Sequence, residues 1–480
     1  MKDLLNEALD AATSAGASYA DVRGVELMTE ALGVRGPQVE ALDRNESNGF
    51  GVRVLVNGAW GYSSSAVLTP KEVQRVALTA VDVAKASATA LSKPVELVPE
   101  PAHKAAWATK IEKDPFEVSL EDKVALLTGA AQTMEKVKGV RVGRGTMDFI
   151  RQQSWFVSSE GSDIDQTVFH TGGGIEATCV SDAEVQVRSY PGSFRGHFAA
   201  AGYELIETMD LQSNAQATAE EAVQLLSADL CPSTTTTVVL DGHQTMLQLH
   251  ESVGHPTELD RVLGMEAAFA GTSFVGIPDL GGLRYGSEHM NVTSDATIEG
   301  GLGTFGYDDE GVEAQRVDLI RDGILVGFQS SRETAATTGA DRSNGTMRAE
   351  GWENFPLIRM TNISILPGNG GTLDDLISEV DDGIFMSTNK SWSIDDKRKN
   401  FQFGCEIAWD IKKGKLGKML KDPRYTGITP VFWGNLDAVG SEWKVWGTPN
   451  CGKGQPGQTM RVGHGTAPTR FLNVSTGTTQ

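Results

Sequence analysis

Apolar and polar positions follow two different periods at the start of the chain. Between residues 2 and 15 apolar side chains recur every three or four positions and stop before Gly16, which predicts an amphipathic helix. Between residues 51 and 56 they alternate, and the run ends at Asn57-Gly58, the dipeptide most typical of a β-hairpin turn. Other strands are expected over 19–27 and 39–43.

Two longer helices are marked by their first residues. Thr69-Pro70 supplies an N-cap and a first-turn proline for a helix to about Ala88. Ser119 is the expected N-cap of a second helix, which runs to about Val137. The remaining elements expected here are strands within 140–190 and a helix around 203–227. Residues 1–229 are therefore predicted to form an N-terminal α+β domain, with two long helices against a sheet.

The second half of the chain changes to short strands separated by turns. A strand at 238–240 leads directly into an apolar-periodic run in which Met246, Leu249 and Val253 share one face of a helix. Further strands are expected at 317–320, 358–366 and 442–446. We therefore place the main domain boundary near 230 and predict that residues 230–480 form a β-rich C-terminal domain that carries the helix.

Composition narrows the classes of ligand and compartment. The formal net charge of −21 argues against direct binding of nucleic acid, and the five lysines between 412 and 421 are expected in a solvated hairpin or loop. No apolar run reaches the ~18 residues of a membrane span, and the N-terminus lacks the apolar core of a signal peptide. The four cysteines are scattered, which favours a reducing compartment and a cytoplasmic protein.

The helix after residue 240 carries His250-Glu251-Ser252-Val253-Gly254-His255, followed by Pro256. Two imidazoles beside a carboxylate suit a hydrolytic zinc site, in which the carboxylate activates water. Residues five apart lie roughly 140° apart around an α-helix, so both rings could not reach one ion from a regular helix. The helix must therefore either widen into a π-bulge or end within the motif. We interpret it as stopping at His255, because the following Pro256 disfavours the α conformation at His255. A chance cluster of core histidines is the alternative.

A third ligand must come from elsewhere in the chain. Cys451 stands in a polar, glycine-rich stretch expected to be a loop, where a cysteine has no packing role, although an incidental loop cysteine is the alternative. Lys453 is expected to lower the pKa of that thiol. Cys405 is a weaker candidate, and Glu258 and Asp260 are expected either to support the histidines or to be surface charges.

These segments together resemble a known family. HESVGHPTELDRVLGMEAAFAGTSF, with CGKGQPGQ near the C-terminus and NGFGVRVLVNGAWGYSS near the N-terminus, is similar to the TldD branch of the TldD/PmbA metallopeptidases, once called modulators of DNA gyrase. The resemblance spans nearly the whole chain. It implies zinc ligation by His250, His255 and Cys451, with Glu251 as general base. The tail around His464 departs from the family pattern, and this histidine either lines the site or lies on the surface.

The resemblance also implies a function. Family members cleave small unfolded peptides and pair their C-terminal domains, so we expect a peptide substrate and a homodimer or a heterodimer with a PmbA/TldE-like paralogue. The expected mechanism is hydrolysis by metal-activated water. The principal alternative is a non-catalytic regulatory partner of a paralogue or of DNA gyrase. A metal-stabilised structural component and a zinc hydrolase of non-peptide amides are further alternatives.

Overall fold

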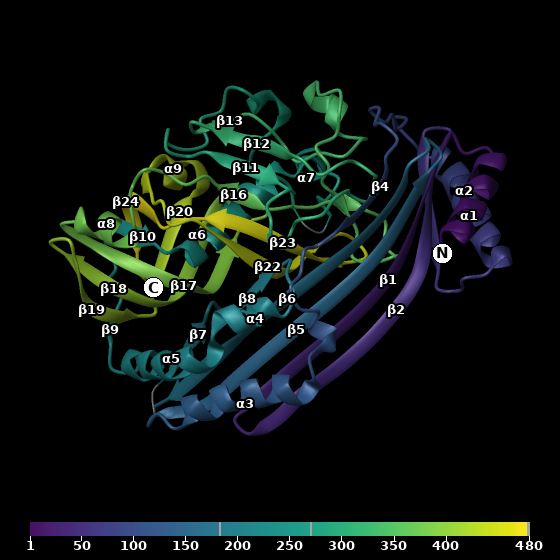
Figure 1. The fold of residues 1–480 in the computed structure, drawn as a ribbon. Coiled ribbons are helices and arrows are strands. Elements are labelled where there is room, and N and C mark those ends of the chain that lie inside the picture. The colour runs from purple at the N-terminus through teal and green to yellow at the C-terminus, as the bar shows by residue number, and fades with distance from the viewer. Residues whose placement is uncertain (182–183, 269–270, 478–480) are drawn as a thin grey trace.

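A computed structural model describes residues 1–181, 184–268 and 271–477. Its first half is built on an antiparallel sheet of unusually long strands, ordered β3-β2-β1-β5-β6-β4, with only β4 parallel to its neighbour (Figure 1). The bounds are β1 Tyr19–Arg35, β2 Gln38–Val56, β3 Ala59–Ser65, β4 Lys104–Ala108, β5 Val140–Ser158 and β6 Asp163–Val180; β7 (Val185–Tyr190) and β8 (His197–Ala199) also pair with β6. The mixed α+β class predicted from the sequence is confirmed.

Helices cover the two ends of this sheet (Figure 1). Near one end, α1 (Lys2–Ser14) and α2 (Pro70–Ala88) bury Leu5 and Val76 against strand residues such as Val52. Near the other end, α3 (Leu120–Glu135) and α5 (Leu211–Leu225) bury Leu127 and Ala219 in a second core. The expected N-caps of α2 and α3 are confirmed.

The second half contains a closed sheet. Strand order β17-β10-β24-β20-β18 closes because β17 also pairs with β18, so the outer strands of this set meet. The bounds are β10 Thr235–Leu240, β17 Asp382–Ile394, β18 Asn400–Lys412, β20 Arg424–Ile428 and β24 Thr469–Thr476, with β9 (Asp229–Leu230), β19 (Lys415–Lys421) and β21 (Leu436–Val439) attached. Strand β10 delivers the chain to α6 (Gly242–Leu249), whose residues from His243 onward are all buried.

Smaller elements complete the second half. A four-stranded sheet contains β11 (Val292–Asp295), β12 (Arg316–Arg321), β13 (Ile324–Leu325) and β16 (Ile363–Ile365). Two hairpins pair β14 (Met347–Arg348) with β15 (Leu357–Ile358) and β22 (Lys444–Lys453) with β23 (Gln458–Thr466). The short helices are α4 (Glu204–Met209), α7 (Leu259–Val262), α8 (Leu373–Ser378) and α9 (Thr429–Gly434).

Buried ion pairs join the two halves. Arg53 on β2 contacts Asp21 on β1 at 2.6 Å and Glu310 in the second half at 3.0 Å, and the three side chains are at most 2% exposed. Gln166 on β6 donates a hydrogen bond from Nε2 to the carbonyl of Tyr307. Since a buried charge is tolerated only when it is paired, these contacts fix the sheet against the second half.

Several predicted boundaries were wrong. The helix expected around 203–227 is divided into α4 and α5 at Asp210, whose φ of 46° interrupts the helical path. The strands expected over 19–27 and 39–43 are far longer, because they pair along their whole length as a hairpin. The run 358–366 is split between β15 and β16. Among the described residues, no helix combines the length and apolar character needed to cross a membrane.

Candidate metal centre

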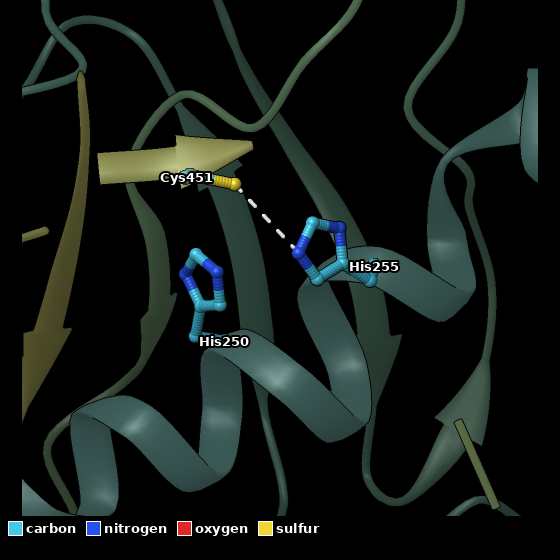
Figure 2. A group of neighbouring side chains, drawn as sticks. All are labelled: His250, His255 and Cys451. Carbon is cyan, nitrogen blue, oxygen red and sulfur yellow. Dashed lines mark hydrogen bonds between the residues drawn. The ribbon is translucent and has the colours of Figure 1, made fainter. Parts of the chain in front are cut away.

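The two histidines of the motif are brought together by a change of helix type. Helix α6 ends at Leu249, and the chain continues as a π-helical turn, His250–Gly254, followed by a 3₁₀ turn, His255–Thr257. The His255 N–H donates to the His250 carbonyl, five residues back. Because the wider turn nearly closes after five residues, the two rings lie side by side and meet edge-on, with centroids 4.8 Å apart (Figure 2).

The interpretation that the helix stops at His255 was therefore wrong, and the π-bulge is the correct alternative. His255 keeps helical angles (φ −63°, ψ −43°) although Pro256 follows it. Proline cannot donate a hydrogen bond to the carbonyl four residues back. The Ser252 carbonyl instead accepts a hydrogen bond from the Tyr285 hydroxyl at 2.5 Å, so the helical path continues with that acceptor satisfied.

Cys451 lies beside the two histidines, although it belongs to the C-terminal part of the chain. It lies on β22, not in the expected loop, and pairs across the hairpin with Met460 on β23. The thiol is buried and points at His255, with Sγ 3.6 Å from Nε2 (Figure 2). One ligand atom from each of His250, His255 and Cys451 lies within 4.8 Å of the others. The fold thus brings together all three residues that the sequence suggested as metal ligands.

A hydrogen-bonded chain fixes the tautomer of His250. His464 Nδ1 lies 3.1 Å from the Ile363 carbonyl, which can only accept, so Nδ1 carries the proton and Nε2 is an acceptor. His250 Nδ1 is 2.9 Å from that Nε2 and must donate to it. The lone pair of His250 is therefore on Nε2, the nitrogen free to bind a metal. His464, for which the sequence left a surface position open, is fully buried beside the site on β23.

Glu258 orients the other ring in the same way. Its Oε2 lies 2.9 Å from His255 Nδ1, which leaves His255 Nε2 to face Cys451. Lys453 Nζ is 3.4 Å from the same oxygen and 2.7 Å from Asp260, so both acids are buried and paired. Glu258 therefore supports a histidine and is not a surface charge, which were the two alternatives expected from the sequence. Asp260 contacts the lysine.

The charges around the site favour the protonation states that a metal requires. Burial lowers the pKa of both His250 and His255, which keeps the imidazoles neutral at physiological pH. Burial alone would raise the pKa of Cys451, but its electrostatic interaction and hydrogen bond with His255, together with the charge of Arg359, lower it. Lys453, which was expected to lower this pKa, pairs with Glu258 and Asp260 and is not among the main causes of the shift.

Glu251 lines a cavity of about 210 Å³ together with His250, His255 and Cys451. Its carboxylate Oε2 is 2.5 Å from Nη1 of Arg398, a residue in the turn between β17 and β18. Sequence analysis missed Arg398, because no local pattern marks an arginine 147 residues away as a partner of the motif. Phe194 and Trp392 also line the cavity, and their rings meet edge-on at 5.2 Å.

The remaining sequence candidate is not part of this group. Cys405 lies on β18, fully buried, and hydrogen-bonds through its backbone to Pro423. The donors that do converge, two imidazole nitrogens and one thiol, are those that zinc prefers. Hydrogen bonds to His464 and Glu258 orient the two imidazoles, and all three donor atoms lie within 4.8 Å of one another, so the residues fit a bound metal ion.

Comparison with known proteins identifies the family of this chain. Family models for PmbA/TldA metallopeptidases match domain 1 at residues 20–84, the central domain at 113–230 and the C-terminal domain at 233–477. A metalloprotease of Methanocaldococcus jannaschii is 31% identical over 93% of this chain and 94% of its own. The chain belongs to the PmbA/TldD metallopeptidase family. The resemblance inferred from the motifs is therefore confirmed, with residues 269–270 of the quoted segment outside the described residues.

Other relatives extend the comparison. A zinc metalloprotease TldD homolog of Saccharolobus solfataricus is 27% identical over 45% of both chains. The crystal structure of TldE from Thermococcus kodakarensis has the same fold, with a TM-score of 0.74 at 17% identity over 99% of this chain and 100% of that one. The family and its metalloprotease members support peptidase activity for the PmbA/TldD chain described here, and the clustered donors support a metal.

Proposed function

We propose that this PmbA/TldD family member is a zinc-dependent peptidase with Glu251 as its general base. The observation that carries the proposal is the buried group of His250, His255 and Cys451, with ligand atoms within 4.8 Å of one another and Glu251 on the same helical turn. Three protein ligands leave a fourth position of a tetrahedral ion open, as in catalytic zinc sites. A structural zinc site would fill that position with a fourth side chain.

The roles of the side chains follow from their positions. A zinc ion held by these three atoms would supply Lewis-acid chemistry at the floor of the cavity. Glu251 accepts a proton from the attacking water and returns it to the leaving amine. His464 and Glu258 hold the rings through their Nδ1 atoms, so that each Nε2 would be available to bind a zinc ion, and Arg398 holds the Glu251 carboxylate.

The proposed substrate is a small unfolded peptide. The cavity of about 210 Å³ admits a few side chains of an extended chain and excludes a folded domain. Met246 and Leu247 add apolar surface to the two aromatic rings of its wall. By analogy with the family, the working unit is a homodimer or a heterodimer with a PmbA/TldE-like paralogue.

The test compares Glu251→Gln with His255→Ala. Glu251→Gln keeps an isosteric side chain without a base, so zinc content should stay near that of the wild type while hydrolysis of an unfolded reporter peptide is lost. His255→Ala should lose both zinc and hydrolysis. Wild-type hydrolysis by Glu251→Gln would overturn the base assignment. Absence of zinc and hydrolysis in the wild type, also with a paralogue added, would overturn the proposed function.

A further inference from the structure

A second group of basic side chains lies between the two halves of the molecule, in which His170 and Arg348 are buried and Arg461 is half-buried. His170 on β6 faces Arg348 on β14 and Arg461 on β23 across a cavity of about 50 Å³. Gln152, Ser154 and Gln166 of the first sheet line the same cavity, and so do the carboxylates of Asp308 and Asp309. The three basic residues come from segments far apart in sequence, and none belongs to the metal centre or its hydrogen-bonded supports.

Several polar atoms of this group have no hydrogen-bond partner among the described residues. Both ring nitrogens of His170 and Nε of Arg461 are buried without a hydrogen-bond partner among the described residues. Arg348 donates from Nη1 to the carbonyls of Met360 and Arg461, at 2.9 and 2.8 Å, and its guanidinium lies over the ring of Phe305. In the part of the chain that the structure describes, neither Arg348 nor Arg461 forms an ion pair, although each is the kind of residue that is buried only when paired.

The nearby acids are engaged elsewhere. Asp308 accepts hydrogen bonds from the backbone N–H groups of Glu310, Val312 and Met347. Asp309 accepts one from the N–H of Ala349 and pairs with Arg23 at 3.3 Å. These contacts satisfy the two carboxylates without neutralising the arginines.

The pKa values of the three basic groups are lowered by burial and, for two of them, by neighbouring arginines. Burial and the charges of Arg359 and Arg461 lower the pKa of Arg348 to about 9, although Asp309 and Cys451 offset part of the effect. Burial, Arg461 and Arg348 likewise lower the pKa of His170. Burial lowers the pKa of Arg461 despite the charge of Glu350. Burial is the largest cause in all three groups, and for His170 and Arg348 the charges of neighbouring arginines act in the same direction.

We propose that the cavity lined by His170, Arg348 and Arg461 is a binding site for a small carboxylate anion. Its volume of about 50 Å³ suits a carboxylate, and the guanidinium groups are the donors that carboxylates prefer. Arg461 follows Met460, the cross-strand partner of Cys451, so the site lies beside the metal centre. The carboxylate can come from a free organic acid or, if the proposed peptidase function holds, from the C-terminus of a peptide.

The first experiment measures the thermal unfolding temperature of the full, zinc-loaded chain. Sodium acetate is titrated at millimolar concentration while sodium HEPES keeps the ionic strength constant. We expect a saturable rise of a few degrees in the wild type, because the ligand binds only the folded chain. Arg461→Met should show no such rise, and in acetate-free buffer it should unfold at or above the wild-type temperature, since the lost guanidinium has no ion-pair partner and its Nε no hydrogen-bond partner among the described residues. The matched control Arg75→Met, at an exposed arginine of α2, should retain the wild-type response.

A flat acetate titration of the wild type, or an equal rise in Arg461→Met, would overturn the proposal without bearing on peptidase activity. A second measurement identifies the source of the carboxylate: KM for a reporter peptide with a free C-terminus is compared with KM for its amide. A peptide carboxylate should lower KM at least about tenfold in the wild type but not in Arg461→Met. Equal KM values together with a positive acetate titration would assign the site to a free acid.

Discussion

Arg398 Nη1 lies 2.5 Å from Glu251 Oε2, and this ion pair joins the hairpin turn between β17 and β18 to the π-helical turn of the metal centre. The turn holds Arg398 at φ 62°, with its N–H donating to the Asp395 carbonyl at 2.8 Å. Its backbone carbonyl also accepts a hydrogen bond from the Thr429 hydroxyl. Arg398 is therefore a positioning residue for the carboxylate that we propose as the base.

Replacing Arg398 should separate turnover from metal binding. Arg398→Ala frees the Glu251 carboxylate to rotate, and we expect kcat to fall by about 100-fold because a misplaced catalytic group is that costly. Zinc content should not change, and Arg398→Lys should recover part of kcat. Measuring kcat and zinc content on the same samples would check this prediction. A loss of zinc equal to the loss of kcat would contradict the positioning role.

His464 should control metal affinity although it is not a ligand. His464→Phe removes the acceptor for His250 Nδ1, and loss of such a support typically weakens metal binding by about 10- to 100-fold. Competition with a zinc-binding dye would measure the change. His289→Phe, at an exposed histidine, is the control and should bind zinc as tightly as the wild type. Unchanged affinity in His464→Phe would show that the hydrogen-bonded chain does not orient His250.

Removal of the metal should lower the stability of the folded chain. The three ligands tie α6 and its π-helical extension to β22, and a ligand present at 100 times its Kd stabilises by about 2.7 kcal/mol. A chelator should therefore lower the unfolding temperature of the wild type. It should have little effect on Cys451→Ser, whereas Cys179→Ser, at a buried cysteine of β6, should respond like the wild type. A wild type insensitive to chelator while it holds zinc would argue against the site.

The free energy of unfolding should fall in mild acid through His197. Burial, with the charges of His243 and Lys444, lowers the pKa of His197 to about 4. The unfolded chain binds a proton near pH 6.5, so between these values it holds more protons than the folded chain. Stability is thus fully present above about pH 6.5 and decreases toward pH 4, by up to about 3 kcal/mol.

The matched variant for this effect is His197→Phe. The phenyl ring can keep the edge-on contact with Trp446 and does not titrate, and Nδ1 of His197 has no hydrogen-bond partner among the described residues to lose. Denaturant unfolding at a series of pH values should show a shallower decline below pH 6.5 for the variant. Parallel curves for the two proteins would contradict the assignment.

The sequence alone determined what depends on near neighbours. Thr69 and Ser119 cap α2 and α3 because a side chain and a backbone N–H three residues on suffice to make the contact. Asn57 and Gly58 form the expected turn with φ of 53° and 76°. The types of metal-binding residue were likewise visible, because the chemistry of imidazole and thiol does not depend on the fold.

Tertiary structure decided everything that joins distant segments. The strand position of Cys451, the burial of His464 against His250 and the pairing of Arg398 with Glu251 all result from how β22, β23 and the β17–β18 turn pack around α6. The π turn also needed that context, since the Ser252 carbonyl is satisfied by Tyr285, 33 residues away. The types of donor could be predicted from the sequence. Their supporting partners could not, because they are set by long-range contacts, and local periodicity indicates neither strand register nor packing.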